Sequence, residues 1–212
     1  MIEYILFDLD GTLYSARGGL EKEVSRRVNE YLSRRLDLSM EEAWALRKER
    51  IRACNYGTTL EWLRAEKGMD EAELESYFAY IHPEHEARGL SPDPRLRSLL
   101  LSFALPMGIL TNSPREHALR ILRKLEIEDL FPSIFDIRRN GLKGKPDPDV
   151  YRGVLGELNL RAESCLFVDD VERYVEAYRA MGGRGVHFDE AGRGGLAPPR
   201  ISSLEELGAF LG

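Results

Sequence analysis

The chain has 212 residues, of which 43% are hydrophobic and 31% charged, and its formal net charge is -6. This is the composition of a globular protein, long enough for one large domain or for a core domain with a smaller inserted one. The acidic balance argues against a nucleic-acid polymer as partner, because such proteins carry a basic stripe, but it does not exclude a small phosphorylated substrate.

The cysteines and the apolar segments favour a cytoplasmic protein. The two cysteines, Cys54 and Cys165, are too few for a disulfide framework and fit a reducing compartment. The first residues lack the basic and apolar pattern of a signal peptide. The most apolar later segment, residues 99–110, is shorter than the roughly 20 residues that cross a bilayer. We expect no membrane segment, and a monomer or a homodimer.

The first expected element is a strand at residues 4–7. Its sequence, Tyr-Ile-Leu-Phe, is apolar throughout, which is typical of a strand buried on both faces. Asp8 and Asp10 follow at once, ahead of Gly11. The carboxyl end of this strand therefore carries two carboxylates.

Residues 20–80 have helical spacing. Apolar residues recur every three or four positions, as at Val24 and Val28, and no strand-like alternation is present. Breaks are expected at residues 55–59 and 67–70, with Thr59 or Asp70 as helix N-caps. This stretch is predicted to be a small all-helical unit.

After a proline-rich boundary at residues 89–94, strands and helices are predicted to alternate. Ser113 is expected as the N-cap of one helix, with Pro114 in its first turn. Cys165 begins an apolar run and is expected to be buried. The expected helices are 95–103, 114–125, 149–159, 171–181 and 203–211, and the expected strands are 107–110, 134–136, 166–168 and 185–188.

This alternation indicates an α/β fold with a doubly wound, Rossmann-like parallel sheet. Ligands of such sheets bind beyond the carboxyl ends of the strands. Three strands end in polar clusters, at residues 8–10, 111–113 and 169–170. We expect these clusters to converge on one crevice, with the helical insertion over it as a lid.

The acids at these strand ends predict a metal site. Two carboxylates as close as those of Asp8 and Asp10 repel each other and raise one pKa unless a cation neutralises them. Asp169 and Asp170 add further oxygen ligands. A site built from oxygen ligands, without His or Cys, favours Mg²⁺ over zinc.

The same residues include the groups that cleave a phosphate monoester. The reaction needs a nucleophile, a proton donor for the leaving oxygen and positive charge on the phosphoryl oxygens. Asp8 is the candidate nucleophile, and Asp10 the candidate acid and then base. Thr111 suits phosphate binding near a helix start, and Lys145 is a fixed cation in a proline-flanked loop. Each residue alone also fits a turn, a cap or a solvated charge, but all of them in this order favour catalysis.

These motifs resemble those of the haloacid dehalogenase superfamily, whose phosphatases have four ordered motifs. Residues 8–13 match the first, 111–112 the second, 145–146 the third and 169–170 the fourth. The resemblance implies an aspartyl-phosphate intermediate on Asp8, with Lys145 steadying the charge. It implies that the phosphoryl group is bound by Thr111 and Asn112, and Mg²⁺ by Asp8, the Asp10 carbonyl, Asp169 and Asp170.

The resemblance also implies two domains and a substrate class. Residues 1–15 and 90–212 would form the α/β core, and residues 16–89 a small helical cap. Within the superfamily, residues 10–14, 18–20, 56–60 and 92–96 look most like the pyrimidine 5′-nucleotidases. Tyr56, Gly57 and Thr58 are then candidate specificity residues of the cap, although a plain turn between helices fits them equally well.

Two segments depart from the family pattern. Val171 and Tyr174 stand where the family usually has a small polar residue and an asparagine, so fewer hydrogen bonds are expected to support the metal carboxylates. Arg138 and Arg139 form a basic stretch, interpreted as solvated charges rather than as contacts to substrate phosphate.

The predicted function is hydrolysis of a small phosphate monoester such as a pyrimidine nucleoside 5′-monophosphate. A phosphoglycolate or sugar-phosphate phosphatase and a phosphomutase remain alternatives, because they share all four motifs. A haloacid dehalogenase is disfavoured by Asp10, which those enzymes lack. A non-catalytic binding module is disfavoured because it has no need of a nucleophile such as Asp8.

Overall fold

A six-stranded parallel sheet forms the centre of the protein. The structure, a computed structural model, describes residues 1–53, 56–192 and 199–212, so Cys54 lies outside the described residues. The strand order is β3-β2-β1-β4-β5-β6. The strands are β1 (Tyr4–Phe7), β2 (Met107–Leu110), β3 (Ser133–Phe135), β4 (Cys165–Asp169), β5 (Arg184–Phe188) and β6 (Arg200–Ile201). The predicted doubly wound α/β fold is confirmed, and the two-residue β6 is the strand that the sequence pattern missed.

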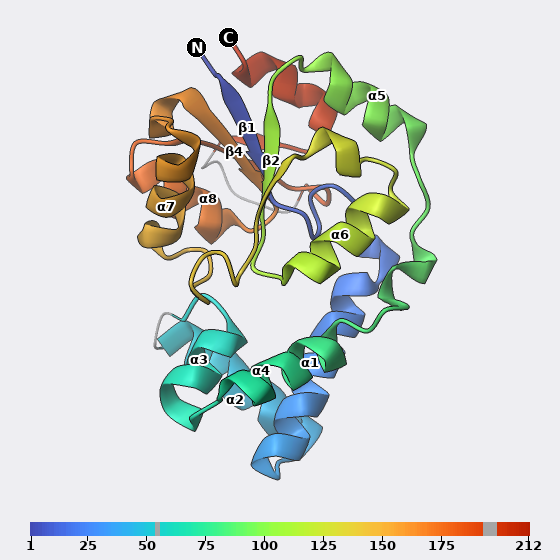
Figure 1. Ribbon diagram of the computed structural model, residues 1–212, viewed down its shortest axis with the longest axis vertical. Coiled ribbons are helices and arrows are strands. Elements are labelled where there is room, and N and C mark those ends of the chain that lie inside the picture. Colours follow the sequence, from blue (N-terminus) through green and yellow to red (C-terminus); the bar gives the residue numbers. More distant parts are fainter. Residues whose placement is uncertain (54–55, 193–198) are drawn as a thin grey trace.

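Both faces of the sheet are covered by helices, which explains why its strands are apolar throughout. In β1, Ile5 and Phe7 pack on one face, with α5 (Pro94–Ser102) and α6 (Arg115–Lys124). Tyr4 and Leu6 pack on the other, with α7 (Pro148–Leu158) and α8 (Glu172–Ala180). Figure 1 shows these helices on either side of the sheet. Cys165 is buried in the second layer, as predicted.

The strand order creates a crevice between β1 and β4. From β1 the chain builds outward through β2 and β3, and it then returns to the other side of β1 for β4 and β5. Neighbouring loops at such a switch point leave in opposite directions and open a space beyond the strand ends. Asp8 follows β1 and Asp169 ends β4, so both acids lie at this crevice.

The expected helices between β1 and β2 are present. They are α1 (Leu20–Leu36), α2 (Met40–Ala53), α3 (Thr59–Lys67) and α4 (Glu71–Ile81). We call them the helical unit. It has its own apolar core, in which Leu32, Trp62 and Leu74 are fully buried. In Figure 1 it lies at the end of the molecule opposite the two termini. The division of the chain into a core domain and a cap domain stays a prediction.

The N-caps of α3, α4 and α6 agree only in part with those predicted. Asp70 is the N-cap of α4 as expected, but Thr58 rather than Thr59 caps α3 through its side chain. Ser113 was wrong as the N-cap of α6. Pro114 occupies that position, and Asp136 Oδ2 accepts from the Arg115 backbone N–H instead. The side chain of Ser113 is thereby free for another contact, described below.

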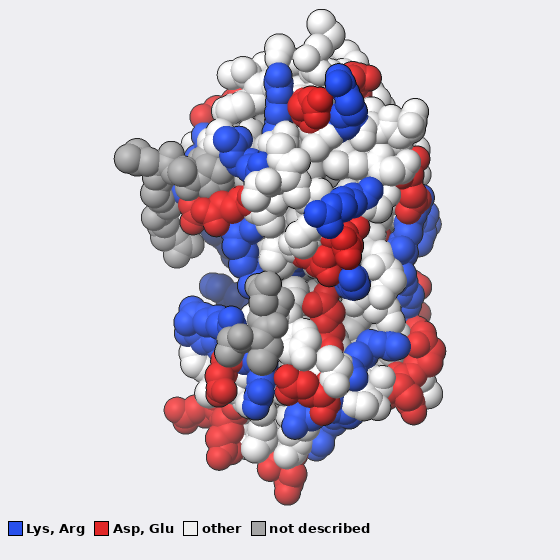
Figure 2. Space-filling model, turned by 90° about the vertical axis from the view of Figure 1, so that its left-hand side faces the viewer, with Lys and Arg blue, Asp and Glu red and all other residues white. Residues whose placement is uncertain are grey.

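Short 3₁₀ helices complete the chain. They are η1 (Ala16–Gly18), η2 (Glu86–Gly89), η3 (Glu128–Leu130), η4 (Ala162–Ser164) and η5 (Leu204–Phe210). The last replaces the α-helix predicted at residues 203–211, and a capping box of Ser203 and Glu206 begins it. Within the described ranges, no helix combines the length and the apolar character that crossing a bilayer requires. On the face drawn in Figure 2, basic and acidic side chains are interspersed.

Candidate active site

Three predicted site residues meet at the carboxyl ends of β1 and β4. Lys145, in the loop before α7, places its Nζ 2.6 Å from Asp8 Oδ1 and 2.6 Å from Asp169 Oδ2. The same nitrogen donates to the Leu110 carbonyl oxygen at 2.8 Å. Lys145 is 1% exposed and Asp169 0% exposed, so these ion pairs are shielded from water. The structure therefore brings the first, third and fourth motifs into direct contact.

Asn112, from the second motif, holds the loop that carries Lys145. Its Nδ2 donates to the Lys145 carbonyl at 3.1 Å, and its Oδ1 accepts from the Lys145 backbone N–H at 2.7 Å. Thr111 Oγ1 accepts from the Ser113 backbone N–H at 3.0 Å, and Thr111 is 1% exposed. Both side chains thus have partners within the chain, and phosphoryl binding by them stays a prediction.

An acidic cluster surrounds the buried Lys145 side chain. Carboxylate oxygens of Asp8, Asp169 and Asp170 lie within 4.8 Å of one another. Burial raises the pKa of Asp8 to about 8, with Lys145 opposing the rise and Asp169 adding to it. Burial and repulsion from Asp8 and Asp169 raise the pKa of Asp170 to about 9. One cation does not compensate three carboxylates, and this set of hard oxygen ligands fits a divalent ion such as Mg²⁺.

The turn after Asp8 explains why a glycine follows. Gly11 has φ +80°, and a Cβ there would lie 2.6 Å from Asp170 Oδ2 and 2.8 Å from Glu21 Oε1. Glu21, in the first turn of α1, is a carboxylate that the sequence analysis missed. Burial, with repulsion from Asp10 and Glu190, raises its pKa to about 7. Negative charge at the crevice is therefore greater than the motifs alone indicate.

Repulsion among these carboxylates predicts that a bound metal ion stabilises the protein. Because folding raises the pKa of Asp170, this group contributes stability to the metal-free protein that is fully present below its unfolded pKa and is lost as pH rises towards about 9. We expect the melting temperature in chelator to fall between about pH 5 and pH 8, and Mg²⁺ to restore it. We expect Asp170→Asn to raise the metal-free melting temperature at neutral pH by a few degrees, at about 2–4 °C per kcal/mol. Calorimetry with and without Mg²⁺ measures both, and a pH-independent melting temperature in chelator would contradict the prediction.

Asp10 lies among donors that the sequence analysis did not identify. His117 Nε2 lies 2.7 Å from Asp10 Oδ1, which also accepts from the Tyr14 hydroxyl. Ser113 Oγ donates to Asp10 Oδ2 at 3.0 Å. Burial disfavours ionisation of Asp10, but His117 and Tyr14 outweigh it and hold its pKa below the usual range. One sequence feature indicates that His117 is buried, because it occupies a position on the apolar stripe of α6 beside Ala118.

Val171 and Tyr174, which depart from the family pattern, both contact residues of the site. Val171 supplies a hydrogen bond through its backbone, whose N–H donates to Asp169 Oδ1 at 2.8 Å. The Tyr174 hydroxyl accepts from Asn112 Nδ2 at 3.4 Å, and its ring lies 5.3 Å from Lys145 Nζ. A carboxylate of the fourth motif therefore keeps a backbone donor although the expected polar side chain is absent.

The predicted specificity segment contacts the loop of Lys145. A Cβ on Gly57 would lie 2.8 Å from the carbonyl oxygens of Gly144 and Lys145, so only glycine fits there. Gly57 and Thr58 line a cavity of about 270 Å³ between the helical unit and the sheet. Tyr56 is not among its lining residues, and its hydroxyl donates to Glu66 Oε1 at 3.3 Å.

The basic stretch makes ion pairs at the surface, and the interpretation that it does not contact substrate phosphate stays a prediction. Arg138 bridges Glu75 of α4 and Glu116 of α6 at 2.8 and 2.7 Å, and it lies over the Phe78 ring. Arg139 pairs with Glu157. Arg138 thus ties the helical unit to α6.

Comparison with curated proteins identifies phosphatases over most of the chain. Phosphatase MT3486 of Mycobacterium tuberculosis is 28% identical over 222 residues, covering 99% of this chain and 97% of that protein. The phosphoglycolate phosphatase of Photorhabdus laumondii is 30% identical over 193 residues, covering 85% of this chain and 77% of the relative. The glyceraldehyde 3-phosphate phosphatase of Methanocaldococcus jannaschii is 25% identical over 189 residues, covering 86% of this chain and 82% of the relative.

Solved structures share the fold over the full chain. A phosphatase of the haloacid dehalogenase type from Thermococcus onnurineus matches with a TM-score of 0.68 at 21% identity, covering 100% of this chain and 98% of that one. The L-2-haloacid dehalogenase of Xanthobacter autotrophicus matches with a TM-score of 0.62 at 18% identity, with coverage of 100% and 98%. The sequence model of the haloacid dehalogenase-like hydrolase family matches residues 2–182 of this chain. The chain therefore belongs to the haloacid dehalogenase-like hydrolase family and is a phosphatase of that family.

Proposed function

We propose that the protein hydrolyses small phosphate monoesters with Mg²⁺, through an aspartyl-phosphate formed on Asp8. The observation that carries this proposal is the contact of the buried Asp8 carboxylate with Lys145, beside a cluster of acids that fits a divalent ion. A buried carboxylate held by one cation beside further carboxylates has the arrangement of an activated nucleophile rather than of a structural ion pair.

The first chemical step joins Asp8 to phosphorus. Its carboxylate oxygen attacks while the ester P–O bond breaks. The leaving alkoxide takes, through Asp10, the proton that Asp10 shares with His117 Nε2 at 2.7 Å. Lys145 stabilises the negative charge of Asp8 and of the phosphoryl oxygens as they approach. Mg²⁺ held by Asp8, the Asp10 carbonyl, Asp169 and Asp170 would neutralise charge on the transferring group.

The second step releases phosphate. The Asp10 carboxylate accepts a proton from water as the water oxygen attacks phosphorus, and the bond between phosphorus and Asp8 breaks. Asp8 is regenerated as a carboxylate and the proton returns to the pair of Asp10 and His117, so the cycle closes. Acid-quenched protein taken during turnover should carry one phosphoryl group on the peptide that contains Asp8. A phosphoryl group located on another residue would refute the mechanism.

The cavity favours a substrate whose organic part is small and carries a second anion. Arg47 from the helical unit and Arg173 from α8 both line it. Arg47 donates to Thr59 Oγ1 and to the oxygens of Ser25 and Asn29, all of them uncharged. Within the part of the chain that the structure describes, neither arginine is in ion-pair contact with a carboxylate. Two such cations suit a carboxylate of the substrate, which arginine binds through paired donors.

The size of the cavity supports the same substrate class. Its volume of about 270 Å³ is below the roughly 300–1,000 Å³ of pockets for drug-sized ligands. The relatives named phosphoglycolate phosphatase also support a phosphorylated small acid. A pyrimidine nucleoside 5′-monophosphate, favoured by the sequence, is the second candidate, because Arg47 and Arg173 also suit the carbonyl oxygens of a pyrimidine ring. Initial rates with 2-phosphoglycolate, a neutral sugar phosphate, UMP and AMP separate the candidates.

Arg47→Met is expected to weaken recognition of a phosphorylated acid specifically. Loss of a hydrogen bond to a charged group costs about 1.5–3 kcal/mol, so kcat/KM for 2-phosphoglycolate should fall about 10- to 100-fold. The value for p-nitrophenyl phosphate, which lacks a second anion, should change by less than about threefold. Lys48→Met is the matched control, because Lys48 is the next residue of α2 and lies exposed over the Trp44 ring. Equal losses with both substrates would contradict the assignment of Arg47.

A further inference from the structure

We propose that His117 is the positioning residue of Asp10, and that Glu86 holds His117 in place from the connection between the helical unit and the sheet. This inference rests on the proposed acid and base role of Asp10. It assigns a function to a buried polar group that belongs to none of the four motifs.

Asp10 is fixed by donors on both carboxylate oxygens. His117 Nε2 lies 2.7 Å from Oδ1, and Ser113 Oγ donates to Oδ2 at 3.0 Å. The Asp10 side chain is 24% exposed, whereas that of His117 is 1% exposed. His117 therefore holds Asp10 from the protein interior and leaves part of the carboxylate open to the crevice. A general acid must be held in one orientation to reach the leaving oxygen, and this contact restricts the orientation of the Asp10 carboxylate.

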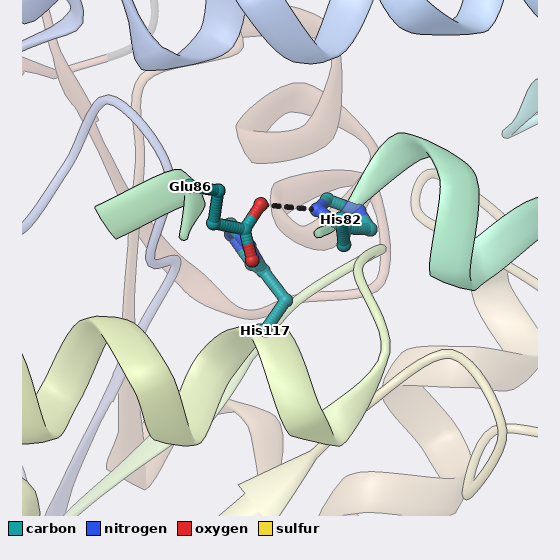
Figure 3. A group of neighbouring side chains, drawn as sticks. All are labelled: His82, Glu86 and His117. Atoms are coloured by element: carbon teal, nitrogen blue, oxygen red, sulfur yellow. Dashed lines mark hydrogen bonds and ion pairs between the residues drawn. The ribbon is translucent and has the colours of Figure 1, made fainter. Parts of the chain in front are cut away.

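Glu86 holds His117 from the opposite side of the imidazole ring. His117 Nδ1 lies 2.9 Å from Glu86 Oε1, and the Glu86 side chain is 0% exposed. Arg120 donates to the same oxygen at 2.8 Å, and His82 Nδ1 lies 2.9 Å from Oε2. Figure 3 shows the Glu86 carboxylate next to both imidazole rings, whose centroids lie 4.2 Å apart. Both ring nitrogens of His117 thus lie within ion-pair distance of a carboxylate, Nε2 of Asp10 and Nδ1 of Glu86, while Nδ1 lacks the geometry of a hydrogen bond.

These residues come from two parts of the chain that are far apart in the sequence. His117 lies in α6, where Ala118 and Ile121 anchor the helix in the apolar core. His82 is the C-cap of α4, and Glu86 begins η2 in the connection that returns from the helical unit. The placement of Asp10 therefore depends on the position of this connection, which follows the helical unit in the chain. Closure of the unit over a substrate and alignment of Asp10 would share one set of contacts.

A metal ion is a poorer explanation of the same cluster. His82, Glu86 and His117 have possible ligand atoms within 4.8 Å of one another. However, the Arg120 guanidinium contacts Glu86 Oε1 at 3.0 and 2.8 Å, so a divalent ion on that oxygen would face a fixed positive charge. The carboxylate is already engaged by one guanidinium and two imidazoles. Hydrogen bonds and ion pairs account for these contacts without an added ion.

The test compares His117→Leu with His117→Gln. Leucine suits the apolar stripe of α6 but cannot donate to Asp10, whereas glutamine retains an N–H donor. With an alkyl phosphate, kcat of His117→Leu should fall about 10²- to 10⁴-fold, with KM changed by less than about threefold. His117→Gln should recover at least tenfold of that loss. Asp10→Asn should reproduce the leucine variant.

A substrate with an activated leaving group makes the test specific. The phenolate of 2,4-dinitrophenyl phosphate leaves without a proton, so its first equivalent should be released by His117→Leu at close to the wild-type rate. The steady-state phase should then be slow, because dephosphorylation still needs Asp10 as base. Glu86→Gln preserves the shape of the side chain. It should also leave the burst close to the wild-type rate and slow the steady-state phase, but by a smaller factor than His117→Leu. It is the second variant should leucine prevent folding.

Several outcomes overturn the proposal. They are equal losses in the burst and steady-state phases, a glutamine variant no better than the leucine variant, and one equivalent of zinc in the purified protein that the leucine variant loses. Failure of the proposed function looks different, because Asp8→Asn would then still release phenolate or the wild type would release none. Melting temperatures of all variants, compared with the wild type, identify losses caused by unfolding.

Discussion

Asp8→Asn should abolish phosphatase activity while leaving the fold intact. The amide cannot form the acyl-phosphate bond, and loss of a nucleophile lowers kcat on the order of 10⁴-fold or more. The fold should survive because asparagine has nearly the same shape and Lys145 keeps its contact with Asp169 at 2.6 Å. Steady-state phosphate release with Mg²⁺, alongside circular dichroism and calorimetry, measures both parts of this prediction.

The melting temperature of this variant separates a catalytic from a structural role. Burial raises the pKa of Asp8, and the nearby Asp169 adds to this against the attraction of Lys145, so the charged carboxylate is not an optimal structural group. In chelator, Asp8→Asn should therefore melt at the wild-type temperature or above it. Near wild-type turnover would refute the mechanism. A fall of the melting temperature with inactivity would instead indicate that Asp8 is needed for folding.

The positions of the strand-end residues could be predicted because they depend on local patterns. Each of the strands β1, β2 and β4 is a short apolar run followed directly by polar residues. Parallel strands bring their carboxyl ends to one edge, so the residues after them must lie close together whatever the details of packing. The contact of Lys145 with Asp8 and Asp169 follows from this geometry once the loop of Lys145 is placed.

The support of Asp10 could not be predicted, because it depends on tertiary register. Glu86 and His117 are 31 residues apart in the sequence and meet only where η2 passes α6. A buried histidine on a helical stripe gives no indication of which carboxylate it faces. Ser113 illustrates the same limit, because its pattern favoured an N-cap, whereas the distant Asp136 provides the cap and leaves Ser113 for Asp10.

The second large effect is expected for Lys145→Met, in both stability and activity. Lys145 is 1% exposed and contacts two buried carboxylates, so removing it leaves both without a cation. Breaking a buried ion pair by removing one partner typically costs about 3–5 kcal/mol, and each kcal/mol lowers the melting temperature by about 2–4 °C in a protein of this size. Turnover should fall by at least about 10²-fold, because the charge that stabilises the phosphoryl oxygens is lost.

Magnesium distinguishes the electrostatic explanation from loss of packing. A divalent ion among Asp8, Asp169 and Asp170 would replace part of the missing positive charge, so Mg²⁺ should raise the melting temperature of Lys145→Met more than that of the wild type. Lys143→Met is the matched control, because Lys143 lies in the same loop but its side chain is 53% exposed and pairs with Asp147 and Asp149. Its activity and stability should remain near wild type, since exposed ion pairs contribute little. An equal response of Lys145→Met and wild type to Mg²⁺ would mean that methionine disrupts packing, and that the charge of Lys145 is not what the acidic cluster requires.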